Sequence, residues 1–214
     1  MNLTRPKLTK AGLEQTDISQ LAAEASLERI IVSRADADGL QAKNLSLDEA
    51  LLEKVLLVEA GLEKLGLTDV ELHACDLSAA RCSESTFTRA HIIGGRMTGI
   101  DLSRSTIKDV VFEDCKLDMA NFRFAKLTRV QFIGCQLTET DFQVAELTDV
   151  AFQDCHLEKV EFGQCKIKHV DARTSQLFDI RGWQSLKGLT VDSMQLAAIA
   201  PQLVLELGII VKDD

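Results

Sequence analysis

The sequence has no tyrosine, only two prolines and few aromatic residues among its 214 positions. It also lacks an apolar run of the roughly 18 residues that a membrane helix requires, and its first residues, 1–6, lack the apolar stretch of a secretion signal. Acidic residues outnumber basic ones by 33 to 24. Nucleic-acid-binding proteins neutralise phosphates with clustered Lys and Arg, so we expect no direct nucleic-acid binding and, instead, basic protein partners. The missing apolar run leads us to expect no membrane contact. The sequence predicts a soluble cytoplasmic protein.

Patterns typical of catalysis are missing too. The sequence contains no nucleophile constellation, no acid pair at motif spacing and no glycine loop that would cradle a phosphate. Gly94 and Gly95 are not followed by Lys-Ser or by a helix start, so we interpret them as a coil corner. We therefore expect no enzyme activity and no cofactor.

The sequence does contain a repeat with a period of five residues. Steps of five from Leu47 to Leu177 pass through 27 positions, of which 25 hold Leu, Ile, Phe or Met. Two places before each of these, 24 of the 27 positions hold Ala, Val, Cys, Ser, Gly or Thr. A period of five fits neither a helix nor an ordinary strand. A solenoid buries it, with the large and the small residue of each pentapeptide pointing inward and the other three pointing outward.

Phe and Leu alternate at the large position from Phe112 to Phe162, which makes a ten-residue super-period. An even number of sides per coil follows. With four sides, Phe112, Phe132 and Phe152 stack in one column and face a second column of Phe122, Phe142 and Phe162 across the centre.

Several segments resemble the A(D/N)LXX units of pentapeptide repeat proteins, notably Ala120-Asn121-Phe122, Cys75-Asp76-Leu77 and Ile100-Asp101-Leu102. This resemblance implies an all-β solenoid, a right-handed quadrilateral β-helix with four pentapeptides per coil. We expect residues 25–180 to form this β-helix, residues 1–24 to form an N-terminal extension or cap, and residues 181–214 to form a C-terminal helix and strand. Seven to eight coils at the inter-strand spacing predict a rod about 35 Å long.

Cysteines fall at inward positions of this repeat and histidines at outward positions. Five of the six cysteines fall at the small inward position and Cys82 falls at a large one, whereas all four histidines fall at outward positions. The thiols are therefore predicted to fill the core, with disulfides only under oxidation, and we expect no metal site.

The C-terminal segment predicts a capping helix that begins at Asp192, is interrupted or kinked at Pro201 and ends at Gly208, followed by a short strand over residues 209–211. The helix is apolar nearly all round, more than a cap requires. An excess of this kind suggests a second copy packing tail to tail. The predicted dimer interface comprises Leu196, Ile199, Leu203 and Leu207.

The same tail, including Ile180-Arg181-Gly182 and Leu207-Gly208-Ile209, resembles the closing segment of quinolone-resistance (Qnr-type) pentapeptide proteins. The resemblance implies a homodimer that binds DNA gyrase and topoisomerase IV, protecting them from quinolones or inhibiting them, by mimicry of duplex DNA.

Two outward columns carry charge when residues are counted by twenty. One column alternates acid and base from Asp69 to His169, and we expect its pairs to be exposed and worth at most about 1 kcal/mol each. The other column and its neighbours are mainly acidic. The predicted partner-binding face comprises Asp101, Asp118, Glu139, Asp141, Glu158 and Glu161.

Two interpretations of these surfaces stay open. The acidic face either occupies a basic DNA-binding groove or is simply a solvated surface, and the outward residues Met119, Phe124 and Val144 either form a contact patch or are scattered. The alternative to topoisomerase binding is an interaction scaffold with another protein partner.

Overall fold

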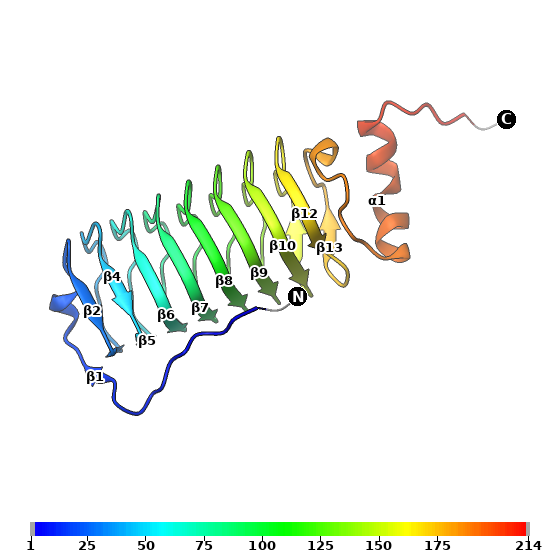
Figure 1. Cartoon of the computed structure of the whole chain (residues 1–214). Helices are drawn as coiled ribbons and strands as arrows, with labels where there is room; N and C mark the ends of the chain where they lie inside the picture. The colour runs from blue at the N-terminus through cyan, green and yellow to red at the C-terminus, as the bar shows by residue number, and fades with distance from the viewer. Residues whose placement is uncertain (1–2, 213–214) are drawn as a thin grey trace.

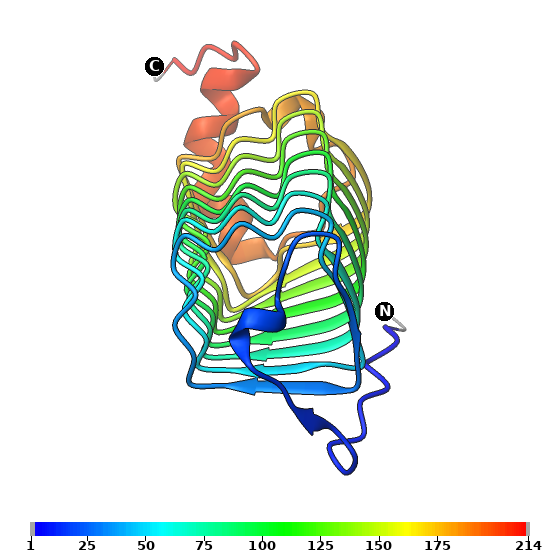
Figure 2. The ribbon, with the colours of Figure 1, turned by 90° about the vertical axis from the view of Figure 1, so that its left-hand side faces the viewer.

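The computed structural model describes residues 3–212, which form a parallel β-solenoid closed by one C-terminal helix (Figure 1). Viewed along its axis, the chain winds in superimposed coils (Figure 2). The fold confirms the predicted quadrilateral β-helix. Its strands are β1 (Glu14–Gln15), β2 (Ser26–Glu28), β3 (Ile30–Ser33), β4 (Ser46–Asp48), β5 (Leu51–Glu53), β6 (Gly66–His73), β7 (Thr86–Ile93), β8 (Thr106–Glu113), β9 (Lys126–Ile133), β10 (Glu146–Gln153), β11 (His156–Glu158), β12 (Lys166–Asp171) and β13 (Gln176–Phe178).

One coil takes 20 residues. Strands β6 to β10 pair in parallel with partners 20 positions apart, as Leu127 pairs with Leu147 and Phe132 with Phe152. On the remaining sides, single bridges between turns keep the same register, for example Asn121 with Asp141. Since each pentapeptide makes one side, this register confirms four sides per coil.

The five-residue pattern fills the interior as predicted. All 27 small positions from Leu45 to Ser175 are buried, and so are all the large positions except the half-buried Ile167 and Leu177 near the C-terminal end. The Phe columns form as expected: Phe132 stacks on Phe112 and on Phe152 at 5.0 Å, and meets Phe122 edge-on at 6.1 Å. Both geometries are favourable for aromatic pairs.

Each corner of the coil is made by the residue two places after a large one. These residues have positive φ along the whole solenoid, from Glu24 (60°) to Asp179 (50°), and most of them are not glycine. Gly94 (φ 62°) is one of the corners, which agrees with its interpretation from the sequence.

The N-terminal residues 3–13, here called the strap, run along the outside of the rod (Figures 1 and 2). The chain then adds β1 next to β3, turns through the short helix η1 (Ile18–Gln20) and buries Leu21 at the end of the core. The division of the chain at residues 24 and 180 stays a prediction.

The strap corrects one expectation about the alternating charge column. Asp69 and Asp109 are not exposed: they are 6% and 4% accessible, because the strap lies over them. The Lys7 N–H donates to Asp69 Oδ1 at 2.8 Å, and the Thr4 N–H donates to Asp109 Oδ1 at 3.2 Å. Sequence spacing within the repeat could not show this contact, since the strap lies outside the repeat.

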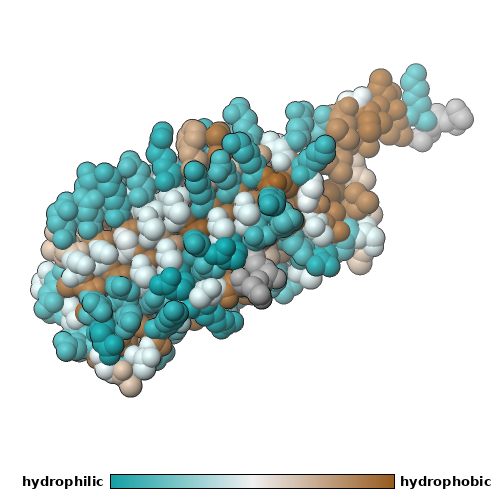
Figure 3. Space-filling model, viewed as in Figure 1, coloured by the Kyte–Doolittle hydropathy of each residue, from teal (hydrophilic) through white to brown (hydrophobic). Residues whose placement is uncertain are grey.

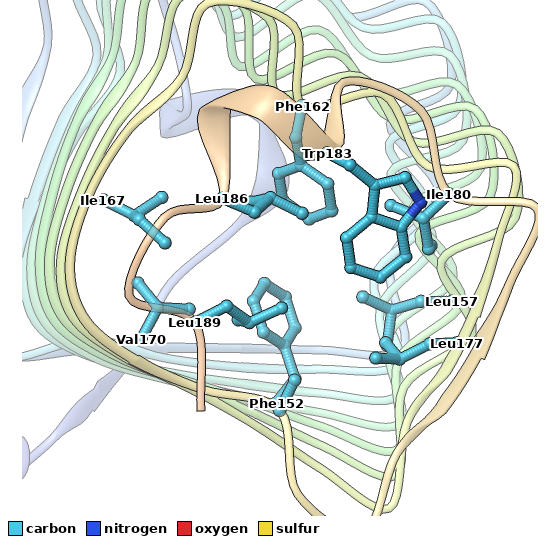
Figure 4. Close-up of a pocket in the computed structure, with 11 residues that line it drawn as sticks. Phe152, Leu157, Phe162, Ile167, Val170, Leu177, Ile180, Trp183, Leu186 and Leu189 are labelled. Atoms are coloured by element: carbon cyan, nitrogen blue, oxygen red, sulfur yellow. The ribbon is translucent and has the colours of Figure 1, made fainter. Parts of the chain in front are cut away.

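At the opposite end, the short helix η2 (Trp183–Ser185) and the segment up to Leu189 close the core. Trp183, Leu186 and Leu189 point down onto Phe152 and Phe162 (Figure 4). The cavity left between them measures about 10 Å³, which is at the lower limit for one water molecule. It is a packing gap and not a ligand site.

Helix α1 (Ser193–Glu206) packs against β13 and η2. It begins at the predicted N-cap: Asp192 accepts from the Gln195 N–H, and the Gln195 side chain accepts in return from the Asp192 N–H. It ends before Gly208 (φ 66°) as expected, but it is not interrupted at Pro201. Residues 209–211 do not form the predicted strand: the segment is exposed beyond the helix, and the Ile209 N–H donates back to Val204 O at 2.9 Å.

Candidate protein-binding surfaces

The predicted acidic residues lie on the sides of the coil built from turns. Asp101, Asn121, Asp141 and Glu161 form one column of consecutive bridged positions, about 4.8 Å apart. Asp118 and Glu158 lie in a second column, and Glu139 lies at a corner with φ of 55°. The repeat therefore brings all six carboxylates onto two adjacent sides that meet at the Glu139 corner, together here called the acidic face.

The carboxylates of the bridged column have a structural task as well. Asp101 Oδ1 accepts from the Ser103 N–H at 3.0 Å, Asp141 Oδ1 from the Gln143 N–H at 2.7 Å, and Glu161 Oε1 from the Gly163 N–H at 2.8 Å. Asn121 Oδ1 makes the equivalent bond with the Arg123 N–H. Acidic or amide residues at this place thus hold the turn, and one oxygen of each carboxylate is already occupied.

Basic side chains also reach the acidic face. Arg123 pairs with Asp141 at 3.0 Å, and Lys159 lies 3.6 Å from Glu158 and 4.0 Å from Glu139. Arg81 and Arg181 stand at the two ends of the bridged column. Arg181 could have been found in the sequence, since it lies twenty positions after Glu161. The face is acidic in sum but carries alternating charge locally.

His156 is a titratable group at the edge of the acidic face. Its ring lies 2.9 Å from Gln176 Oε1 and 3.2 Å from Glu158 Oε2. The hydrogen bond with Gln176, followed by that with the Glu158 carboxylate, raises the pKa of His156 above its ordinary value. The same contacts favour the protonated, positively charged ring, which offsets part of the charge of the acidic face.

A second surface is apolar and belongs to α1 and the segment after it. Leu196 is 52% exposed and Leu207 is 66% exposed, and residues further along are exposed as well. In Figure 3 this end of the molecule shows the largest continuous hydrophobic colouring. The exposed apolar residues of this surface are Met194, Leu196, Leu205, Leu207, Ile209, Ile210 and Val211.

Ile199, one of the four predicted interface residues, does not belong to the exposed surface of the single chain. Its side chain is 4% exposed within the single chain, because it lies on the inner side of α1 towards the rod. Leu203 is half-buried. Helical periodicity predicted an apolar helix, but only the orientation of α1 decides which side is left uncovered.

The outward residues Phe124 and Val144 lie at corners of successive coils, and Phe124 is 43% exposed. The Arg104 guanidinium lies 5.0 Å from the Phe124 ring centre and that of Arg123 lies 5.8 Å away. These are cation–π contacts within the chain itself. Met119, at 57% exposure, lies at a different corner.

All six cysteines are free and buried. In the column of Cys115, Cys135 and Cys155, each thiol donates to a backbone carbonyl of the preceding coil, as Cys135 Sγ does to Phe112 O at 3.3 Å. Within residues 3–212, no three His, Cys, Asp or Glu side chains gather in a group able to hold a metal ion. The described residues also contain no helix with the length and apolar character of a membrane span.

Comparison with known proteins agrees with this architecture. The family model of the pentapeptide repeat region matches residues 65–132 and 125–181, more than half of the chain. No curated protein matches the sequence.

Solved structures similar to the chain are pentapeptide repeat proteins. HetL, involved in heterocyst differentiation regulation in the cyanobacterium Nostoc sp. strain PCC 7120, is 17% identical with a TM-score of 0.36, covering 80% of this chain and 91% of HetL. QnrB1, a plasmid-mediated fluoroquinolone resistance protein, is 20% identical with a TM-score of 0.40, covering 92% of this chain and 95% of QnrB1. A protein of the Arabidopsis thaliana thylakoid lumen is 13% identical with a TM-score of 0.34, covering 59% and 71%. On the match of the repeat region itself, the chain belongs to the pentapeptide repeat family.

Proposed function

We propose that the chain is a non-enzymatic interaction protein whose acidic face binds the basic, DNA-binding channel of a type II topoisomerase, DNA gyrase or topoisomerase IV, and protects the enzyme from quinolones or inhibits it. The observation that carries the proposal is the bridged column of Asp101, Asp141 and Glu161 on a rigid rod. Fixed carboxylates steer a basic partner by long-range attraction, so affinity should fall as salt rises. The resemblance of the tail to Qnr-type proteins supports the choice of partner.

The proposal includes a homodimer formed through the exposed apolar surface of α1. Leu196 and Leu207 support it because side chains of this kind are rarely left uncovered together in one patch. A two-fold pairing of the tails would cover them and double the length of the rod.

The test removes charge from the acidic face without breaking its turns. Asn121 shows that an amide fits this column and keeps the turn bond, so D101N, D141N and E161Q combined should leave the fold intact. Three half-buried surface charges at roughly 0.5 kcal/mol each predict about tenfold weaker inhibition of gyrase supercoiling, or tenfold weaker protection from ciprofloxacin.

The matched control makes the same change of charge elsewhere, in the combined variant E84Q, D114N and D154N, whose side chains are exposed outside the acidic face. Equal activity of the two triple variants would rule out the acidic face as the contact. A wild-type chain that neither inhibits gyrase nor protects it at micromolar concentration would rule out the topoisomerase.

A second candidate is a scaffold for a different protein partner. The ion pairs of Arg123 and Lys159 favour it, because they give the face an alternating pattern that uniform phosphates do not have. Affinity capture with the wild-type chain distinguishes the two: recovery of another protein that is lost with the acidic-face variant, and no recovery of topoisomerase, supports the scaffold.

A further inference from the structure

The strap is bound by the rod mainly through its backbone. Asp69 and Asp109 accept the N–H groups of Lys7 and Thr4, and Arg29 Nη2 donates to Gly12 O at 3.4 Å. All three rod residues belong to the same column of corner residues, counted by twenty. The rod thus recognises an extended peptide along a single edge, at a different corner from the acidic face.

The spacing of the carboxylates matches an extended chain. Asp69 and Asp109 are two coils apart, which is about 9.6 Å at 4.8 Å per coil. Thr4 and Lys7 are three residues apart, which is about 10 Å at 3.3 Å per residue. Every second coil therefore meets every third residue of an extended segment.

Each carboxylate is fixed for this role by an arginine. Arg89 donates twice to Asp69, with its Nε at 2.7 Å from Oδ1, and Arg129 donates twice to Asp109, at 2.6 and 2.7 Å. These bidentate pairs hold the carboxylates in one orientation. The acceptors are therefore set in position independently of the strap.

Two outward apolar side chains lie in the row beside the column, separated from each other by Glu71 and His91. Leu51 and Val111 occupy outward positions of β5 and β8, yet they are only 2% and 3% exposed and are not part of the interior core. Leu3, Pro6 and Leu8 of the strap are half-buried. Further along, Lys10 Nζ lies 3.8 Å from Glu71, so the strap meets the rod with apolar contacts and with basic charge against acidic.

We propose that this edge is a second protein-binding surface, a peptide track that binds an extended basic segment of a partner, and that the strap is a tethered competitor for it. The track comprises Asp69, Asp109, Leu51 and Val111. Recognition through backbone N–H groups does not depend on the side chains of Thr4 and Lys7, so a partner segment with the same spacing fits equally well. Tethering gives the strap a high effective concentration, which keeps the track closed until a partner outcompetes it.

The experiment uses a fluorescently labelled synthetic peptide of residues 3–15 and the full-length chain. The double variant Thr4→Pro and Lys7→Pro removes both donating N–H groups of the strap and leaves the track unchanged. We expect it to bind the peptide at least tenfold more tightly than the wild-type chain in an anisotropy titration. Adding D69N and D109N to this variant should abolish the gain.

The control is Thr9→Pro, since the Thr9 N–H makes no hydrogen bond within the described residues, and it should bind the peptide as the wild-type chain does. Equal affinity of the wild-type chain and the double-proline variant would overturn the proposal, and so would binding that survives D69N and D109N. If the proline variant does not fold, hydrogen exchange in the wild-type chain decides. Saturating peptide must then speed exchange of the Thr4 and Lys7 amides, and unchanged exchange would refute the track.

Discussion

Each pentapeptide places two side chains in the interior and one residue in a strained corner. The inward pair is supported on both sides by the same pair in neighbouring coils, as Phe132 is by Phe112 and Phe152. The corner residue is constrained by its backbone instead, because the chain must turn there with positive φ. Asn, Asp and Gly tolerate this conformation best, and a β-branched residue tolerates it poorly.

Val144 is a β-branched corner residue with φ of 60°. Asn should relieve its strain without the loss of chain stiffness that Gly would cause. We expect Val144→Asn to stabilise the protein by about 1 kcal/mol, seen as a melting temperature higher by about 2 to 4 °C. The same change at Gly134, a corner glycine, should not stabilise, and a lower melting temperature for Val144→Asn would show that Val144 packing outweighs the strain.

At the scale of elements, the two ends of the solenoid decide whether its terminal coils keep their hydrogen bonds. Helix α1 provides hydrogen bonds to the last coil through two glutamine side chains. Gln195 Nε2 donates to the carbonyls of Ala172 and Ser175 at 2.7 and 2.6 Å, and Gln202 Nε2 donates to Ile180 O at 2.5 Å. Each side chain satisfies backbone acceptors that the next coil would otherwise have bonded.

Gln195 makes four hydrogen bonds, two of them through the capping box at Asp192. We expect Gln195→Ala to destabilise the protein by about 2 to 3 kcal/mol, because it leaves the carbonyls of Ala172 and Ser175 and the Asp192 N–H without their side-chain partner. Thermal melting followed by circular dichroism measures the change. Gln176→Ala is the control, because its side chain contacts the exposed His156 ring, and an equal loss there would contradict a special role of Gln195.

At the other end of the chain, the contribution of the strap to stability depends on the charge of Asp69 and Asp109. Hydrogen bonding from Arg89 lowers the pKa of Asp69, and that from Arg129 lowers the pKa of Asp109, with the strap N–H groups acting in the same direction. A carboxyl whose pKa is lower in the folded state stabilises the protein above its unfolded pKa. That stabilisation is lost as the pH falls through the lower, folded pKa.

At pH 7, D69N with D109N should therefore lower the melting temperature by about 4 to 8 °C, for about 2 kcal/mol lost. The difference from the wild-type chain should shrink once the pH falls below the ordinary Asp value of 3.8. Melting curves from pH 7 to pH 2 measure it, with D114N and D154N as the control pair. A difference that does not change with pH would refute the electrostatic origin.

The whole molecule is a rod with one charged side, one covered edge and one apolar end. The strap runs along a different corner from the acidic face, whereas the acidic face reaches α1 at its C-terminal end, where His156 lies beside Met194 and Ile199. Charge repeats along the rod because every outward position recurs each 20 residues, whereas the apolar surface occurs once, at the C-terminal end.

The dimer predicts different outcomes for neighbouring residues of α1. Leu196→Glu with Leu207→Glu should give a folded monomer, because both side chains are exposed in the single chain. Ile199→Glu should instead destabilise the monomer, because that residue is buried. Sedimentation velocity with circular dichroism separates these effects, and a wild-type chain that sediments as a monomer at micromolar concentration would refute the dimer.

The sequence by itself determined the core and the register. A side chain such as Phe132 recurs in phase with its neighbours every five residues, and this local rule fixes inside and outside, so the Phe columns, the buried cysteines and the acidic column with Asp141 could all be predicted. Counting by twenty could also have found Arg181. These features need only the repeat.

Only the tertiary structure decided what lies outside the repeat. Burial of Asp69 and Asp109 depends on a non-repeating strap, more than sixty residues away in sequence, and no periodicity relates the two. The inner position of Ile199 depends likewise on how α1 docks on the last coil, which Gln195 and Gln202 fix through carbonyls that are free only because the solenoid ends there. A repeat determines its own interior. Its contacts with the strap and with α1, which do not repeat, depend on where hydrogen-bonding groups of the solenoid are left without a partner in the next coil.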